Sequence, residues 1–148
     1  MLLCRAQTDT NKFTISSKEH RVFRTSKNSS NSFSPPTFNV IDTTRGFALL
    51  FTFFNDASLP ALNTGRPYKV VSALANSDEV TIRASNTVSA TNRSYYPTGT
   101  DNVVATVEDR NGKLYITLPK TVVKHNASSD TLHISANVHE CDRDPCYN

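Results

Sequence analysis

Apolar and polar residues alternate with a period of two along most of this chain, which is the spacing of half-buried β-strands. The alternation is clearest in Glu79–Ser85, where Val80, Ile82 and Ala84 fall on one face. Nine segments either alternate in this way or form short apolar runs between turn residues: Lys12–Ser16, Thr37–Asp42, Gly46–Phe54, Tyr68–Ala75, Glu79–Ser85, Asn102–Asp109, Lys113–Pro119, Thr121–His125 and Thr131–Cys141. The pattern predicts an all-β fold of about 8–10 short strands, arranged as a two-sheet antiparallel sandwich, Ig-like for example, or as a jelly roll.

Turn residues between these segments add detail to the prediction. Asn111-Gly112 separates two predicted strands and favours the positive φ angles of a tight hairpin. Ser16–Arg24 has the Ser-x-x-Glu spacing of a helix capping box but little apolar cover, so at most a short helix is expected there. Ser26–Ser34 and Thr87–Asp101 are polar and predict loops, each too short to separate two domains.

Two stretches are similar to a known family in their rhythm. FNVIDTTRGFALLFTFFND (38–56) and DEVTIRAS (78–85) resemble CUB-type sandwich domains, in which an aromatic-led strand, a glycine turn and an apolar strand precede a D-x-V-x-I-R strand. The cysteines that mark those domains are missing at the matching positions, and their acidic calcium-site residues have no counterpart that we can place. The resemblance therefore implies a fold and carries over no functional residue.

The composition indicates one domain that works outside the cell. A length of 148 residues suits a single domain. Only 20% of the residues are charged, and Ser, Thr and Asn take up the difference, which is typical of extracellular β proteins. Residues 1–6 match the end of a secretory signal, with cleavage before Gln7 and Cys4 and Ala6 as the small flanking residues. The alternatives are a signal remnant followed by a domain at 7–148, or an ordinary N-terminus.

Without Cys4 the chain keeps one pair of cysteines, Cys141 and Cys146, as a secreted domain with a single disulfide would. The surrounding HECDRDPC stretch offers His139 and several carboxylates to a metal ion, but a lone C-x4-C pair lacks the second half of a structural zinc site. We therefore predict the disulfide and no metal. If Cys4 is retained, a bond from it to either partner would instead join the two ends of the chain.

Several function classes find no support in the sequence. The net charge of +3 is too small for a nucleic-acid protein, and no apolar run is long enough to form a transmembrane helix. Nucleophile-elbow, zinc-protease and phosphate-loop motifs are absent, so neither an enzyme nor a cofactor is predicted. A hydrolase whose active-site residues are dispersed in sequence remains a remote alternative.

Two groups of residues are candidate contacts for a partner. Tyr95 and Tyr96, next to Arg93, give a polar segment the rigid aromatic side chains that recognition loops favour; alternatively they cover one end of a sheet. A basic run suits an anionic surface such as a sulfated glycan, or is simply a solvated face. It comprises Lys18, Arg21, Arg24 and Lys27.

Three sequons and one apolar strand complete the candidates. Asn28, Asn92 and Asn126 begin N-x-S sequences, all in segments predicted to be loops, although about three such sequences are expected by chance in a chain this rich in Asn, Ser and Thr. The segment Gly46–Phe54 is apolar on both faces, which predicts a central strand or, alternatively, a self-association surface. The residues proposed for self-association are Phe47, Phe51, Phe53 and Phe54.

Together these observations predict a secreted or cell-surface β-sandwich glycoprotein that acts in binding or adhesion, with a glycan or a protein as its partner. The alternative is a structural subunit of a coat, pilus or capsid. Its main support is the strongly apolar segment at 46–54.

Overall fold

The computed structural model describes residues 11–31, 34–86 and 93–147, and apart from one short 3-10 turn at Asp56–Ser58 (η1) every regular element in them is a strand. The all-β prediction is therefore confirmed. The strands are β1 (Lys12–Ile15), β2 (Lys18–Arg21), β3 (Arg24–Asn28), β4 (Thr37–Asp42), β5 (Phe47–Phe53), β6 (Gly65–Val70), β7 (Glu79–Asn86), β8 (Ser94–Pro97), β9 (Val104–Arg110), β10 (Lys113–His125) and β11 (Thr131–His139).

All eleven strands belong to one hydrogen-bonded sheet in the order β2-β1-β11-β10-β9-β6-β7-β5-β4-β3, with β8 paired to both β10 and β7. The pairing of β6 with β7 is parallel and the others are antiparallel, so the sheet is mixed. Because β8 joins β7 to β10, the strands β7, β8, β10, β9 and β6 form a closed circuit of pairings. The finer choice between a sandwich and a jelly roll remains a prediction.

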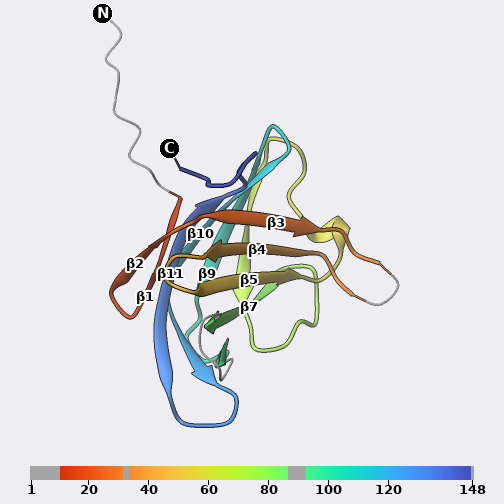
Figure 1. Cartoon of the computed structure of the whole chain (residues 1–148). Helices are drawn as coiled ribbons and strands as arrows, with labels where there is room; N and C mark the ends of the chain where they lie inside the picture. Colours follow the sequence, from red (N-terminus) through yellow and green to blue (C-terminus); the bar gives the residue numbers. More distant parts are fainter. Residues whose placement is uncertain (1–10, 32–33, 87–92, 148) are drawn as a thin grey trace, which may run out of the picture.

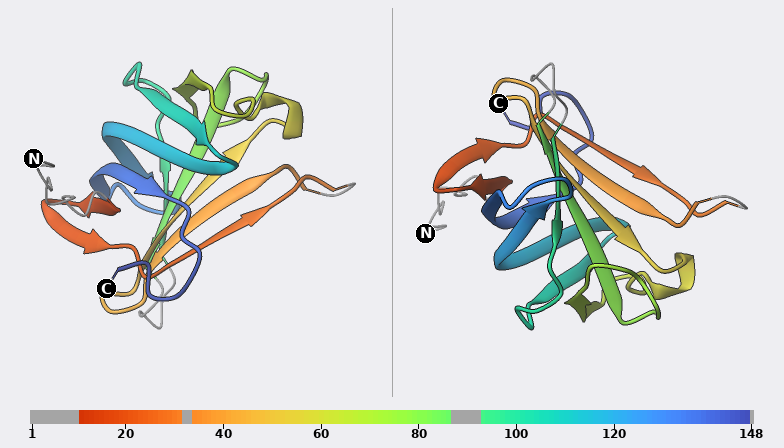
Figure 2. Two further views of the ribbon diagram at one scale, coloured as in Figure 1. Left: turned by 90° about the horizontal axis from the view of Figure 1, so that it is seen from above. Right: turned by 90° about the horizontal axis from the view of Figure 1, so that it is seen from below.

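The sheet turns back on itself, and its two ends face each other across one core. Figure 2 shows β3, β4, β5 and β7 on one side of the molecule and β1, β2, β10 and β11 on the other. Phe13 and Ile134 from the second group belong to the same buried cluster as Phe38 and Phe51 from the first. Alternate residues of each strand supply this cluster, as the period-two pattern predicts.

The segment predicted to be a central strand does lie in the sheet interior, as β5 between β4 and β7 (Figure 1). Phe51 and Phe53 are 0% and 1% exposed. These two rings are core residues, so they present no surface for the predicted self-association. Phe47 packs partly buried against the core, and Phe54, just past the end of β5, is exposed.

The structure corrects several local predictions. No helix forms at Ser16–Arg24; instead Ser16 and Ser17 adopt positive φ angles of 48° and 73° in a two-residue turn that joins β1 to β2. This geometry matches the twist of a hairpin and usually selects Asn or Gly, which is why the sequence does not reveal it. The two predicted loops also contain strand residues. The first, Ser26–Ser34, begins within β3, and the second, Thr87–Asp101, contains β8. Lys113–His125 forms one strand with a register shift between Leu118 and Thr121, where two strands were predicted.

The residues after β11, Glu140–Tyr147, cross from the end of β11 to β3, and we call them the C-terminal segment. The backbone N–H of Cys146 donates to the carbonyl of Phe23 at 2.9 Å, and the N–H of Cys141 donates to Oγ1 of Thr25 at 3.1 Å. Cys141 and Cys146 lie at disulfide distance, with Cα atoms 5.4 Å apart, as the sequence predicts. The predictions about Met1–Ala6 and Cys4 fall outside the described residues.

Candidate functional site

The two candidate tyrosines lie on opposite faces of β8. Tyr95 is 7% exposed and is paired in register with the buried Ala84 of β7, whereas Tyr96 is 36% exposed. Consecutive residues of a strand face opposite sides, so one ring enters the core and its neighbour reaches solvent. Tyr95 therefore has little surface to offer a partner, and Tyr96 is the tyrosine available for contact.

Tyr96 borders a surface cleft of ≈ 270 Å³ that is bounded by β8, the end of β10 and the turn that follows β10. We call it the Tyr96 cleft. Tyr96 and Lys124 are register partners across β8 and β10, so their side chains are neighbours. The lining residues are Tyr96, Pro97, Thr98, Lys124, His125, Asn126 and Ser128.

Hydrogen bonds within the β10–β11 turn fix one wall of this cleft. The N–H of His125 donates to the carbonyl of Asp130 at 2.9 Å, and Oγ of Ser128 lies 2.9 Å from Nδ1 of His125. The same hydroxyl accepts the N–H of Asp130 at 3.2 Å. The His125 ring also packs on the Tyr95 ring, with centroids 5.5 Å apart. Tyr95 thus supports the cleft from beneath.

The charges around Tyr96 are mainly positive. Arg93 pairs with Asp130 at 2.8 Å, and hydrogen bonding to Tyr95 together with the Asp130 charge raises the pKa of the Arg93 guanidinium. Lys124 and Arg83 differ from it, because neither makes an ion pair with a carboxylate in the described parts of the chain. Arg83 precedes Ala84 on β7, so it lies on the outward side shared by Tyr96. We call Arg83, Tyr96 and Lys124 the Tyr96 surface.

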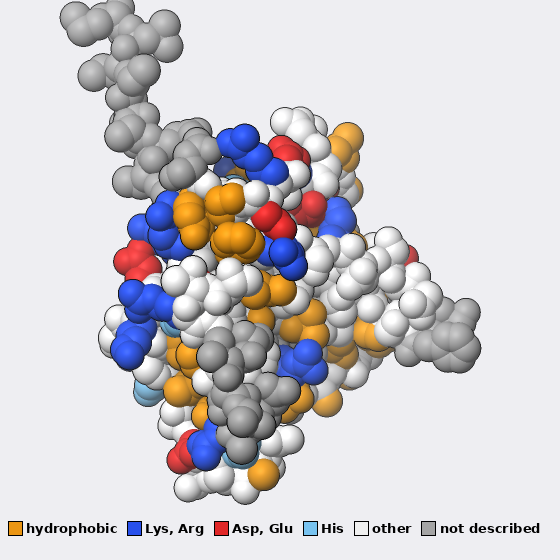
Figure 3. Space-filling view, viewed as in Figure 1, with side chains coloured by type: hydrophobic (Ala, Val, Ile, Leu, Met, Phe, Trp, Pro, Cys, Tyr) orange, Lys and Arg blue, Asp and Glu red, His pale blue; other side chains and the backbone are white. Residues whose placement is uncertain are grey.

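The predicted basic run lies in another part of the molecule, on β2 and β3, and acids and an aromatic ring of the C-terminal segment meet much of its charge. Arg24 pairs with Asp144 at 2.7 Å and Lys27 with Glu140 at 3.0 Å, while the Arg21 guanidinium lies 3.8 Å from the centre of the Tyr147 ring. Figure 3 shows acidic side chains interleaved with basic ones at this end of the molecule. Lys18 remains exposed at the start of β2. The fold therefore does not join the basic run and the tyrosines into one site.

The described sequons differ in their surroundings. Asn28 is the last residue of β3 and is exposed, so it lies in a strand and not in the predicted loop. Asn126 is exposed in the β10–β11 turn, in agreement with the predicted loop. Asn92 lies outside the described residues.

A second cleft, of ≈ 470 Å³, lies beside the C-terminal segment. Tyr115 and His139 are register partners on β10 and β11 and stack with ring centroids 4.9 Å apart. The Arg110 guanidinium covers the Tyr115 ring at 4.2 Å. The charged groups here are paired with each other, for example Lys113 with Asp142 at 2.6 Å. This cleft therefore has fewer charged groups available to bind an external ion than the Tyr96 surface has.

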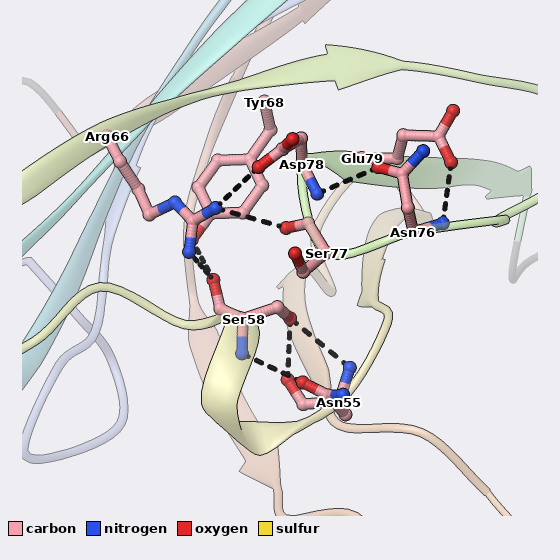
Figure 4. Close-up of polar contacts among 8 residues, drawn as sticks. All are labelled: Asn55, Ser58, Arg66, Tyr68, Asn76, Ser77, Asp78 and Glu79. Carbon is pink, nitrogen blue, oxygen red and sulfur yellow. Dashed lines mark hydrogen bonds and ion pairs between the residues drawn. The ribbon is translucent and has the colours of Figure 1, made fainter.

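Figure 4 shows a polar cluster that joins η1, β6 and the residues leading into β7. Arg66 pairs with Asp78 at 2.9 Å, donates to the carbonyl of Ser58 at 3.0 Å and lies over the Tyr68 ring. The Tyr68 hydroxyl also donates to the Ser58 carbonyl, and burial raises the pKa of Tyr68 to about 12. Asn55 caps η1 through its side chain. These groups satisfy one another, which indicates a structural role.

A buried polar pair joins β2 to the end of β4. Nδ1 of His20 lies 3.0 Å from Oδ2 of Asp42, and the two residues are 2% and 4% exposed. The His20 ring stacks on Phe13 and meets Phe47 edge-on. Burial, the largest influence, lowers the pKa of His20 despite the opposing effect of Asp42. The pair is sealed from solvent, so it is suited to holding strands together rather than to acting on a substrate.

Within the three described ranges, no group of three or more His, Cys, Asp or Glu side chains could hold a metal ion. Nor is any helix there long and apolar enough to span a bilayer. No family model, curated protein or solved structure matches this chain.

Proposed function

We propose that this all-β protein is a recognition module that binds an acidic glycan or protein partner through the Tyr96 surface. The observation that carries the proposal is the position of an exposed tyrosine beside Arg83 and Lys124, two cations without a carboxylate partner among the described residues. A cation that is already ion-paired, such as Arg24, would have to give up its carboxylate partner in order to bind an acidic ligand. Arg83 and Lys124 can gain a partner without that loss.

The side chains that make up the site support a binding function without catalysis. Tyr96 supplies a rigid ring with few rotatable bonds, so ordering it on binding costs little conformational entropy. Thr98 and Ser128 add hydroxyl groups at the cleft wall, and Pro97 adds an apolar contact. An aromatic face surrounded by a few polar groups is the usual composition of a ligand site. In this proposal the chain is not an enzyme, and turnover in a broad hydrolase substrate screen would contradict it.

The proposal also places the protein outside the cell, as a secreted or surface-exposed glycoprotein. Its support is the pair Cys141 and Cys146 at disulfide distance, since such bonds persist mainly in oxidising compartments. Intact mass under non-reducing conditions, measured on protein from a secretory host, tests this part. Free, alkylatable thiols at both positions would argue against it.

A glycan array combined with a pull-down from cell extract would test the binding function. The informative variant is Tyr96→Ala, because it removes the exposed ring and leaves Tyr95 in the core. We expect Tyr96→Ala and the charge reversal Lys124→Glu each to abolish the detected interaction. Lys18→Glu is the matched control, an exposed lysine on the distant strand β2. If Tyr96→Ala and Lys124→Glu both retain every interaction of the wild type, the Tyr96 surface is not the binding site.

A further inference from the structure

The wall of the Tyr96 cleft contains a sequon for N-linked glycosylation. Asn126 and Ser128, the first and third residues of Asn126-Ala127-Ser128, both line the cleft, together with Tyr96 and Lys124. Asn126 follows the end of β10 by one residue and is exposed in the turn. The attachment point for a glycan and the proposed contact residues therefore border the same hollow.

The turn also restricts how far Asn126 can move away from the cleft. His125 and Asp130 are joined through their backbones at 2.9 Å, and Ser128 is held by both His125 and Asp130. The His125 ring in turn packs on the core residue Tyr95. A glycan on Asn126 would thus leave the protein from a fixed position, two residues from Lys124.

From this juxtaposition we propose that Asn126 is an N-glycosylation site and that its glycan covers the Tyr96 cleft, so that the chain exists in a covered and an open form. In the modifying reaction the Asn126 side-chain nitrogen bonds to the anomeric carbon of an activated oligosaccharide diphosphate donor. The amide gives up one proton, and the diphosphate leaves with the former glycosidic electron pair. The inference rests on the proposed function only in assigning a purpose to the cleft, because the covering itself can be measured without a ligand.

Covering would change how many chains can bind. Because the glycan is covalent, glycosylated and unglycosylated chains do not interconvert, and each open chain keeps its own Kd. With nine-tenths of the chains glycosylated at Asn126, only about one-tenth of them would be competent to bind. The occupancy of Asn126 would therefore set the binding capacity of the protein.

The test compares wild-type protein from a secretory eukaryotic host with Asn126→Gln from the same host. Asn28→Gln is the matched control, because Asn28 is an exposed sequon residue at the end of β3, away from the cleft. Peptide mass spectrometry gives the occupancy at each site. Hydroxyl-radical labelling gives the exposure of Tyr96, with Tyr115, at the other end of β10, as the internal reference.

We expect Asn126 to be occupied and Tyr96 to be labelled several-fold more slowly in the wild type than in Asn126→Gln. Asn28→Gln should leave the labelling of Tyr96 at the wild-type rate. An unoccupied Asn126, or equal labelling of Tyr96 with and without its glycan, would overturn the inference. If the glycan covers Tyr96 but Tyr96→Ala still binds every partner, the covering stands and the proposed binding function fails.

Discussion

Acidification should destabilise this protein through the buried His20. Its ring lies between Phe13 and Phe47, and burial lowers its pKa below the usual value. The unfolded chain, in which His20 has an ordinary pKa near 6.5, therefore binds a proton more readily than the folded chain does. As the pH falls below about 6.5, the free energy of unfolding should fall, and it should stop falling once His20 is protonated in the folded state as well.

Because only one proton is involved, the effect of His20 on the free energy of unfolding has an upper limit. A difference of one bound proton changes the free energy of unfolding by at most about 1.4 kcal/mol per pH unit. Burial is the largest influence on His20; the hydrogen bond and the charge of Asp42 oppose it, and the charges of Arg45 and Lys18 add to it. The His20 contribution should be constant only well above pH 6.5, where the unfolded chain is deprotonated as well, and its slope should appear as the pH falls through about 6.5.

Urea unfolding of the wild type and His20→Gln at several pH values between 5 and 8 measures this slope. Glutamine can still donate to Asp42 but does not titrate. The variant loses two ring contacts, each worth about 0.5–1.5 kcal/mol, so its stability should be lower at pH 7 while the acid-side slope becomes flatter. His133→Gln, at an exposed position of β11, is the control and should keep the wild-type slope. An identical slope in His20→Gln and the wild type would refute the reasoning.

Three further predictions use urea unfolding at neutral pH. Phe51→Ala removes a ring that is 0% exposed, and it should cost about 3–5 kcal/mol; a change below 1 kcal/mol would show that the ring is not in the core. Replacing Cys141 and Cys146 with Ser should cost only about 2 kcal/mol, because the bond would close a short loop; complete unfolding would contradict this. Tyr95→Ala should destabilise by roughly 3 kcal/mol, whereas Tyr96→Ala should stay within about 0.5 kcal/mol of the wild type; equal losses would contradict their opposite burial.

The parts of the fold that the sequence predicted are those in which the hydrophobic pattern is strong. Glu79–Ser85 became β7 because its alternate residues are required in the core. Asn111-Gly112 likewise became a hairpin turn, with φ angles of 55° and 88°. In both cases the information is local, so a short window of sequence is enough.

Two of the missed strands, β2 and β3, have little apolar content of their own. β3 reads Arg-Thr-Ser-Lys-Asn and lies at one edge of the sheet, where one side of the strand has no partner strand among the described residues. Its strand conformation depends on pairing with β4, and two of its cations meet acids of the C-terminal segment, more than a hundred residues away in sequence. A window of sequence does not contain such contacts. A polar edge strand also protects a sheet from pairing with other chains, so its composition resembles that of a loop for a physical reason.

Contacts between distant segments also explain why the candidate site proposed from the structure differs from the residues predicted from the sequence. Counting charges along the chain selects the basic run Lys18–Lys27, whose members are close in sequence, and the fold places acids and Tyr147 beside most of them. In a sheet, neighbours come from different strands, and the cations beside Tyr96 are Arg83 of β7 and Lys124 of β10. Neither belongs to a cluster in the sequence, and both lack a carboxylate partner in the described ranges. For a β protein, then, strand pairing and the internal ion pairs show which cations lie beside an exposed ring without a carboxylate partner, and local charge density along the sequence does not contain that information.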